Sequence, residues 1–176
     1  MITYKKASST EELNQILELQ KSNLPQGLSK EELKEEGFLT VKHSLEIIQK
    51  MNDECPHTIA KFNDEVIGYA LSMTKSFASE IEILKPLFLE ISKIISNENY
   101  IVMGQICVGK EFRKQGVFRG LYKFMKEKVA RDYDLIITEI DAQNTRSLSA
   151  HKSVGFRKIK TYFSNNQEWV IVALKG

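Results

Sequence analysis

Residues 100–131 read YIVMGQICV, GKEFRKQG and VFRGLYKFMKEKVAR in succession, and this stretch decides the fold. The first segment is an apolar run rich in β-branched side chains, which predicts a strand. A charged segment follows and ends at Gly116, beyond which apolar residues recur at helical spacing. A strand, a basic turn and a helix in this order aim backbone N–H groups and the positive end of the helix at one point. Arg113, Lys114 and Arg119 add positive charge there, so we expect the turn to bind a phosphate group.

The same stretch also imitates the start of a nucleotide-binding P-loop, through Gly104 followed by Gly109-Lys110. In that motif a Ser or Thr comes directly after the Lys, and its hydroxyl binds magnesium. Here the position is Glu111, whose carboxylate would repel phosphate. The first glycine also lies inside the predicted strand rather than in a loop. We therefore reject the P-loop interpretation, and an ordinary strand–turn–helix without a ligand remains the alternative.

The composition is that of a soluble globular protein, and the length of 176 residues suits one domain over 1–176. Its 25 Lys and Arg residues nearly balance 23 Asp and Glu, so the charge gives no reason to expect a nucleic-acid partner. The N-terminus lacks the apolar region of a signal peptide, and no apolar run approaches the roughly 20 residues of a membrane span. Cys55 and Cys107 match neither a disulfide framework nor a zinc pattern. We expect a cytoplasmic protein with no membrane partner and no metal.

Apolar alternation and turn signals predict seven strands, at residues 2–6, 57–62, 66–73, 100–108, 135–140, 156–163 and 168–174. Helices are expected from the capping box Ser9–Glu12 onward, from a second capping box at Ser29 to about Gly37, and then over 40–51, 78–96 (begun or broken near Pro86), 117–129 and 144–154. No repeat, linker or low-complexity tract interrupts this order. The pattern indicates a single α+β domain.

Two motifs resemble those of the GCN5-related N-acetyltransferase (GNAT) family. Residues 113–118, RKQGVF, are similar to the family's pyrophosphate-binding signature Gln/Arg-x-x-Gly-x-Gly/Ala. Arg113 and Gly116 match this signature, whereas Phe118 stands where the family usually carries Gly or Ala. Residues 144–156, NTRSLSAHKSVGF, resemble the second family landmark, in which Asn opens a helix, a small residue and an aromatic acid follow, and Gly-Phe ends it.

The resemblance implies a GNAT-like domain: a twisted, mixed but mostly antiparallel sheet of about seven strands, with helices on both faces and a V-shaped splay between the fourth and fifth strands. It implies that the protein transfers an acetyl group from acetyl-CoA, as cosubstrate, to a primary amine of a small molecule or protein by direct attack. It also leaves room for a homodimer. The residues it implies for cofactor binding are Ile106, Cys107, Val108, Arg113, Lys114, Gln115, Gly116, Val117, Phe118, Arg119, Asn144 and Ser147.

His151 is the candidate catalytic residue, because it stands where most relatives carry Tyr. Imidazole can donate a proton to the departing thiolate, whose conjugate acid has a pKa of about 8.5. His151 shares a helical face with Asn144 and Ser147, so a polar groove wall without proton transfer is an equal alternative. Backbone N–H groups at the end of the strand, at 106–108, could polarise the thioester carbonyl.

No general base can be assigned from the sequence. Many relatives place a carboxylate near the position of Val102, and the strand 100–108 carries none. The possible substitutes are Glu80, Glu82, Glu139 and Asp141, residue types that usually lie solvated at the surface. A non-catalytic acyl-CoA-binding sensor therefore remains the alternative function. The missing carboxylate and Phe118 favour the sensor, while the shared face of the 144–151 segment favours the transferase.

Overall fold

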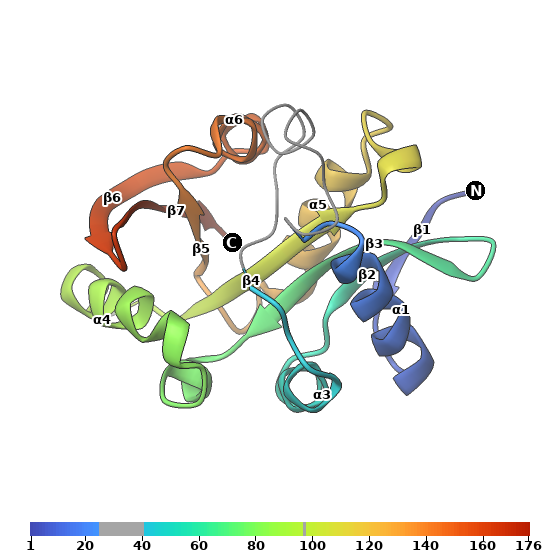
Figure 1. Cartoon of the computed structure of the whole chain (residues 1–176), viewed down its shortest axis with the longest axis horizontal. Coiled ribbons are helices and arrows are strands. Elements are labelled where there is room, and N and C mark those ends of the chain that lie inside the picture. Colours follow the sequence, from blue (N-terminus) through green and yellow to red (C-terminus); the bar gives the residue numbers. More distant parts are fainter. Residues whose placement is uncertain (25–40, 97) are drawn as a thin grey trace.

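Seven strands form one twisted sheet in the order β1-β2-β3-β4-β5-β7-β6 (Figure 1). The computed structural model describes residues 1–24, 41–96 and 98–176. Only β4 and β5 run parallel; every other neighbouring pair is antiparallel. The strands are β1 (Thr3–Lys6), β2 (Thr58–Phe62), β3 (Glu65–Met73), β4 (Tyr100–Val108), β5 (Leu135–Asp141), β6 (Arg157–Ser164) and β7 (Gln167–Lys175). The seven predicted strands and the mixed sheet are thus confirmed.

Helices cover both faces of the sheet, as expected. They are α1 (Thr10–Lys21), α3 (Leu45–Glu54), α4 (Lys85–Ile94), α5 (Val117–Val129) and α6 (Thr145–Ser153). On one face α1 and α3 pack on β2 and β3, and α4 packs over β4 and β5. On the other face α5 packs across β2 to β5 and α6 lies beside it. Neighbouring residues of β2 face opposite sides of the sheet, because Ile59 packs against α1 and Ala60 against α5.

One helix start differs from the prediction, and another agrees with the predicted start near Pro86. Helix α3 begins at Leu45, because Ser44 is its N-cap and accepts a hydrogen bond from the Ile47 N–H. Helix α4 begins at Lys85 with Pro86 in its first turn, a position that proline favours, after short 3₁₀ turns at Lys75–Ala78 and Glu82–Leu84. The expected helix from Ser29 to about Gly37 lies outside the described residues.

Strands β4 and β5 separate soon after they pair. Their register runs only from Tyr100 opposite Leu135 to Val102 opposite Ile137, although β4 continues to Val108 and β5 to Asp141. This is the V-shaped splay that the family resemblance implied. The parts of β4 and β5 beyond these paired residues are therefore open to side chains from other elements.

A bulge lies in β4 at the splay. Leu71 of β3 pairs with Gln105 and Ser72 with Met103, so Gly104 between them is the extra residue. The Ser72 N–H donates instead to Nδ1 of His57 at 3.0 Å, and Nε2 of the same ring donates to the Ile48 carbonyl at 2.9 Å. His57 is fully buried, and it serves as a structural link between the bulge and α3.

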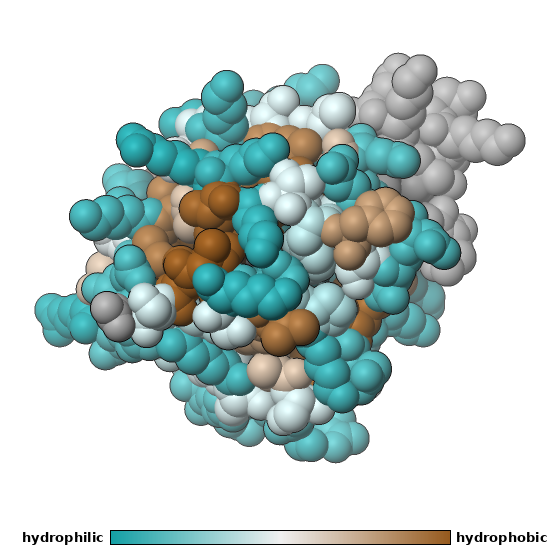
Figure 2. Space-filling model, turned by 90° about the vertical axis from the view of Figure 1, so that its left-hand side faces the viewer, coloured by the Kyte–Doolittle hydropathy of each residue, from teal (hydrophilic) through white to brown (hydrophobic). Residues whose placement is uncertain are grey.

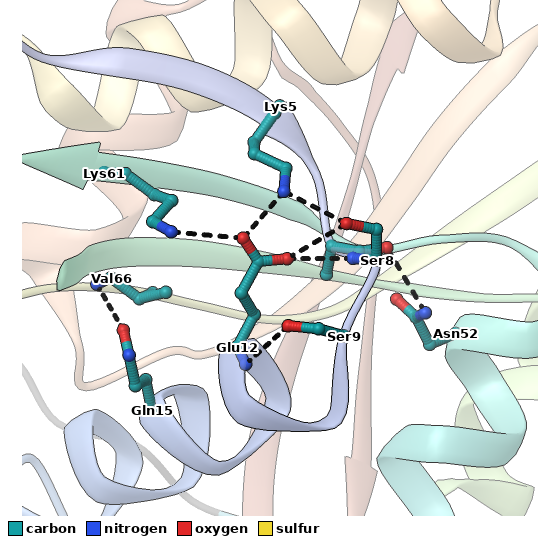
Figure 3. A network of polar contacts seen from close by, with 9 residues as sticks. Lys5, Ser8, Ser9, Glu12, Gln15, Asn52, Lys61 and Val66 are labelled. Carbon is teal, nitrogen blue, oxygen red and sulfur yellow. Dashed lines mark hydrogen bonds and ion pairs between the residues drawn. The ribbon is translucent and has the colours of Figure 1, made fainter. Parts of the chain in front are cut away.

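A buried carboxylate ties the first helix to the edge of the sheet (Figure 3). Ser9 caps α1 by accepting from the Glu12 N–H at 3.2 Å, which confirms one half of the predicted capping box; the other half differs, because the Glu12 carboxylate bonds to the Ser8 N–H and not to that of Ser9. The Glu12 carboxylate accepts from the Ser8 N–H at 2.9 Å, and from Lys5 of β1 and Lys61 of β2 at 2.7 and 3.2 Å. Burial alone would raise the pKa of Glu12, but these hydrogen bonds outweigh burial and lower it to about 2.

Candidate active site

The turn between β4 and α5 has the backbone geometry of an anion site. Gly116 is the N-cap of α5 with φ 81°, and Lys114 is also left-handed with φ 62°. Alternation of right- and left-handed residues curls successive N–H groups toward one side of the chain. A Cβ added at Gly116 would meet no described atom within 4 Å, because it would point into open space. The first turn of α5 presents its N–H groups and positive dipole end to the same space.

That space is a cavity of about 340 Å³ between the end of β4, the turn and α6. Of the twelve residues expected to bind the cofactor, all except Gln115 line it; the Gln115 amide instead donates to the Glu111 carbonyl at 2.7 Å. The lining residues that the sequence did not predict are Asn23, Phe112, Arg146, Ala150, Ser153 and Val154. Three of these six lie on α6 and Val154 is its C-cap; helical spacing from Ser147 could have found Ala150 and Val154. Asn23 comes from the end of α1, and no local signal connects it to this turn.

Arg113 holds the turn in place as well as lining the cavity. Its Nη2 donates to Oδ1 of Asn23 at 2.6 Å, and its Nε donates to the Val108 carbonyl at 3.2 Å. Asn23 is itself buried and bonded to the Leu19 carbonyl at 2.8 Å. The guanidinium therefore joins the end of α1, the end of β4 and the turn. Its charge lies at the cavity, but part of its hydrogen-bonding capacity serves the fold.

His151 lies behind the wall of the cavity, with only 2% of its surface exposed. Nδ1 donates to the Ser147 carbonyl at 2.7 Å, because a carbonyl oxygen can only accept. Nε2 must then accept from the Tyr122 hydroxyl, 2.7 Å away. Burial lowers the pKa of His151 to about 4, although the bond to Ser147 opposes the shift. The ring is therefore neutral near pH 7, and both nitrogens are engaged.

Phe118 covers this histidine. Its ring lies edge-on to those of His151 and Tyr122, with centroids 5.2 Å away in both cases, and Phe156 closes the cluster from the other side. Phe118 lines the cavity while His151 does not. The aromatic residue at the position where relatives carry Gly or Ala thus stands between the cavity and the imidazole.

A second cavity, of about 140 Å³, adjoins the splay from the opposite face of the sheet. It is bordered by Val102–Gly104 of β4, and Gln105 alone separates this part of the strand from the segment Ile106–Val108 that lines the first cavity. The 3₁₀ turn before α4, α4 itself, β5 and the β6–β7 hairpin supply its other walls. The two cavities therefore meet consecutive parts of one strand, where that strand leaves its parallel neighbour.

Glu139 of β5 places a carboxylate in the second cavity. Burial raises the pKa of Glu139 to about 7, and a hydrogen bond from the Tyr162 hydroxyl partly offsets this shift.

Of the four carboxylates considered as possible bases, Glu80 and Glu82 are exposed, as expected of surface carboxylates. The expectation is wrong for Asp141, which is buried and accepts from the Gln143 N–H and the Gln167 amide, and for Glu139, which is partly buried. Neither burial can be read from the local sequence, since both arise from the packing of the closing hairpin over β5.

The comparisons with known proteins agree with this architecture. A family model described as "Acetyltransferase (GNAT) family" matches residues 13–156. The chain belongs to this family. It is an acetyltransferase, and the turn, the splay and α6 of this enzyme all lie within the matched segment.

Solved structures of several acetyltransferases share the fold. The ribosomal-protein-S18-alanine N-acetyltransferase from Escherichia coli aligns with TM-score 0.66 and 14% identity, covering 99% of this chain and 94% of that one. A putative acetyltransferase from Salmonella typhimurium, yncA, solved with its cofactor acetyl-CoA, aligns with TM-score 0.65 and 13% identity, covering 99% and 93%. A chain of the NatC complex bound to Gag peptide and CoA aligns with TM-score 0.68 and 18% identity, covering 99% and 98%. No curated protein sequence matches this acetyltransferase.

Two further properties of the acetyltransferase concern its described residues only. They hold no group of three or more His, Cys, Asp or Glu side chains placed to bind a metal ion. Within the same ranges, every helix is too short or too polar to cross a membrane.

Proposed function

We propose that this acetyltransferase binds acetyl-CoA in the first cavity and a primary amine in the second, and joins them at the β4–β5 splay. One observation carries the proposal: the two cavities approach the splay from opposite faces, one lined by the phosphate-binding turn and the other by Glu139. Acetyl-CoA supplies an acetyl group on a thioester. The protein has to hold this donor, admit the amine and accept a proton.

The residues of the first cavity suit the donor. Gly116 leaves room for the pyrophosphate to approach the backbone, and Lys114 and Arg119 add charge beside the N-terminus of α5. Backbone N–H groups at the end of β4 can polarise the thioester carbonyl as negative charge develops there. Asn144 caps α6 by accepting from the Ser147 N–H at 3.1 Å, so it orients the helix that forms the far wall.

Glu139 is the group that takes the proton of the attacking amine. Amines are mostly protonated at neutral pH, so a base must act before or during attack. A carboxylate whose pKa is about 7 is deprotonated in roughly half of the molecules at pH 7 and is a stronger base than an exposed one. The Tyr162 hydroxyl fixes its orientation. A sensor needs no such group beside its ligand, so Glu139 supports catalysis over the binding-only alternative.

The departing thiolate takes its proton from His151 or from water. His151 remains the predicted donor, but its Nδ1–H is held by Ser147 and Phe118 covers the ring. Donation would need a different tautomer and a movement of Phe118. Water is the alternative donor, because a thiolate with a conjugate-acid pKa of about 8.5 leaves without strong assistance.

The test of the proposal is Glu139→Gln, which keeps the shape and an acceptor for Tyr162. Thiol release from acetyl-CoA with an active amine should fall in kcat/KM by about 10²–10⁴ at pH 7, while acetyl-CoA affinity by calorimetry is unchanged. The wild-type rate should drop as the pH falls below about 7, because Glu139 becomes protonated, and the variant should lack this decrease. Glu82→Gln, at an exposed carboxylate on the same side of the sheet, is the control. Full turnover by Glu139→Gln would rule out its role.

We also propose that the enzyme works in the cytoplasm. Both cysteines, Cys55 and Cys107, are buried as free thiols, which suits a reducing compartment. Burial raises the pKa of Cys107 to about 12, so this thiol is inert despite lining the first cavity.

A further inference from the structure

We propose that the second cavity selects a primary amine carried by an apolar group of modest size, with no second positive charge near it. The inference rests on the proposed function, since it takes the Glu139 cavity as the acceptor site. The amine would meet Glu139, and the rest of the acceptor would lie against apolar walls. Those walls are Val41, Met73, Ile83, Leu84, Pro86, Leu87, Val102, Met103 and Trp169. The uncharged polar side chains of Thr138, Tyr162, Ser164, Asn165 and Gln167 line the remainder on the β5 and hairpin side, so they can hydrogen-bond the acceptor but offer no negative charge to a second ammonium group.

The charge distribution favours a single amine. Of the described residues that line the cavity, Glu139 alone carries a carboxylate. The nearby acids of the α4 region are already paired, Glu90 with Lys93 and Lys160, and Glu82 with Lys85. A second ammonium group placed among the apolar walls would lose its hydration without gaining a partner. Polyamines and aminoglycosides are therefore poor acceptors for this site.

The volume limits the size of the apolar group. A cavity of about 140 Å³ has room for a small apolar group beside the amine and not for a large one. An alkyl or amino-acid side chain of four to five carbons would fill it. Burial of each methylene should strengthen binding about fourfold, up to that length.

The surface around the cavity is apolar as well. Apart from Met1, the strongly exposed large hydrophobic residues of the described chain lie between Glu82 and Ile94 or on β6. These two segments border the second cavity. The residues are Ile83, Leu89 and Ile94 in the α4 region and Ile159 and Phe163 on β6, with exposures from 40% to 71%. Phe163 lies between the lining residues Tyr162 and Ser164 and therefore points to the opposite face of the sheet, so the apolar surface beside the cavity comes mainly from the α4 region. Figure 2 faces this side, where apolar atoms reach the surface between hydrophilic ones. Exposed apolar surface beside a cavity marks a binding site more often than chance.

The same chemistry occurs in free alkylamines and in the N-terminus of a peptide that begins with an apolar residue. A panel of propylamine, butylamine, pentylamine, leucinamide, a Leu-initiated peptide and spermidine separates these sources. Thiol release should show kcat/KM rising about fourfold per methylene from propylamine to pentylamine, with spermidine at least tenfold below pentylamine. Preference for the Leu-initiated peptide assigns a peptide N-terminus, and preference for pentylamine assigns a small amine; either supports the proposal.

Spermidine turning over faster than pentylamine would overturn it. So would the absence of release with every apolar amine in a protein that binds acetyl-CoA by calorimetry. Failure to bind acetyl-CoA would instead count against the proposed function, and the two failures are thus distinguishable.

A charge placed at the rim gives a second test. Ile83 lines the cavity and is 49% exposed, so Ile83→Glu should fold normally. We expect its kcat/KM for pentylamine to fall about tenfold and that for spermidine to rise by a similar factor, with acetyl-CoA affinity unchanged. Leu89→Glu is the matched control, since Leu89 is 59% exposed nearby on α4 but does not line the cavity. Equal behaviour of the two variants would contradict the proposal.

Discussion

His151 matches the family motif in its position in the chain, but its hydrogen bonds and its packing differ from what the role of an acid requires. The family places an acid at this point of α6, and this chain supplies a group able to donate a proton. Packing changes what the group can do, because its Nδ1–H is bonded to Ser147 and its Nε2 to Tyr122. Phe118, the other departure from the family pattern, closes over the same ring. The two residues that depart from the family pattern, His151 and Phe118, therefore belong to one aromatic cluster.

The variant His151→Phe separates the two roles of this residue. As a structural residue, its loss leaves the buried Tyr122 hydroxyl without an acceptor, which should cost about 1–3 kcal/mol in the free energy of unfolding. Turnover should then stay within about threefold of the wild type when measured at a temperature where the variant is folded. His151→Gln, which keeps an acceptor, is the control for stability. A fall of 10²–10⁴ in kcat with unchanged acetyl-CoA affinity would instead establish His151 as the acid.

At the scale of an element, the turn before α5 depends on a conformation that favours glycine. Charge reversal at Arg113 would test it poorly, because the bonds to Asn23 and the Val108 carbonyl would be lost together with the charge. Substitution of Gly116 gives a clearer test of the turn, since no described atom lies within 4 Å of a Cβ added there. Any loss of stability or of acetyl-CoA affinity on substitution of Gly116 therefore comes from the left-handed φ or from intrusion of the new side chain into the cavity.

Gly116→Ala and Gly116→Val distinguish these two causes. Both should lose about 1–2 kcal/mol of stability, because φ 81° is unfavourable for any side chain. Only valine projects far enough to occupy the place of the pyrophosphate, so its acetyl-CoA affinity should fall by well over tenfold while alanine loses much less. Calorimetry with CoA measures both. Wild-type affinity in Gly116→Val would mean that the anion binds elsewhere.

At the scale of the whole molecule, the strands and the turn before α5 were predictable because their signals are local. The β2–β3 and β6–β7 hairpins, for example, turn through two left-handed residues each, Asn63-Asp64 and Asn165-Asn166, and Asn and Asp favour this conformation. The second cavity was not predictable, since α4, β5 and the last hairpin meet there only after folding. Glu139 looked like a surface residue for the same reason. The helix predicted over 40–51 begins instead at Leu45, because the Ser44 side chain caps it, and a serine within an apolar periodic pattern does not by itself reveal that role.

Acid should destabilise the entire fold through its histidines, all three of which are buried. Burial lowers the pKa of His43, His57 and His151 from 6.5 to about 4, so the native state stays neutral while the unfolded chain gains protons below pH 6.5. Their stabilising contribution is therefore complete above pH 6.5 and is lost as the pH falls toward 4. Glu139 opposes them, because its raised pKa lets the native state take up a proton between pH 7 and 4.5.

The net difference of about two protons predicts a loss of roughly 2–3 kcal/mol per pH unit between pH 6 and 5. Urea unfolding at pH 7, 6 and 5 would measure it. The low pKa of Glu12 adds its own loss only below about pH 4.5, so it does not contribute in this window. In His151→Gln one titrating group is absent, and the slope should decrease by about 1.4 kcal/mol per pH unit. A stability that is flat from pH 7 to 5 would mean that the histidines are protonated in the native state, and the tautomer deduced for His151 would then be wrong.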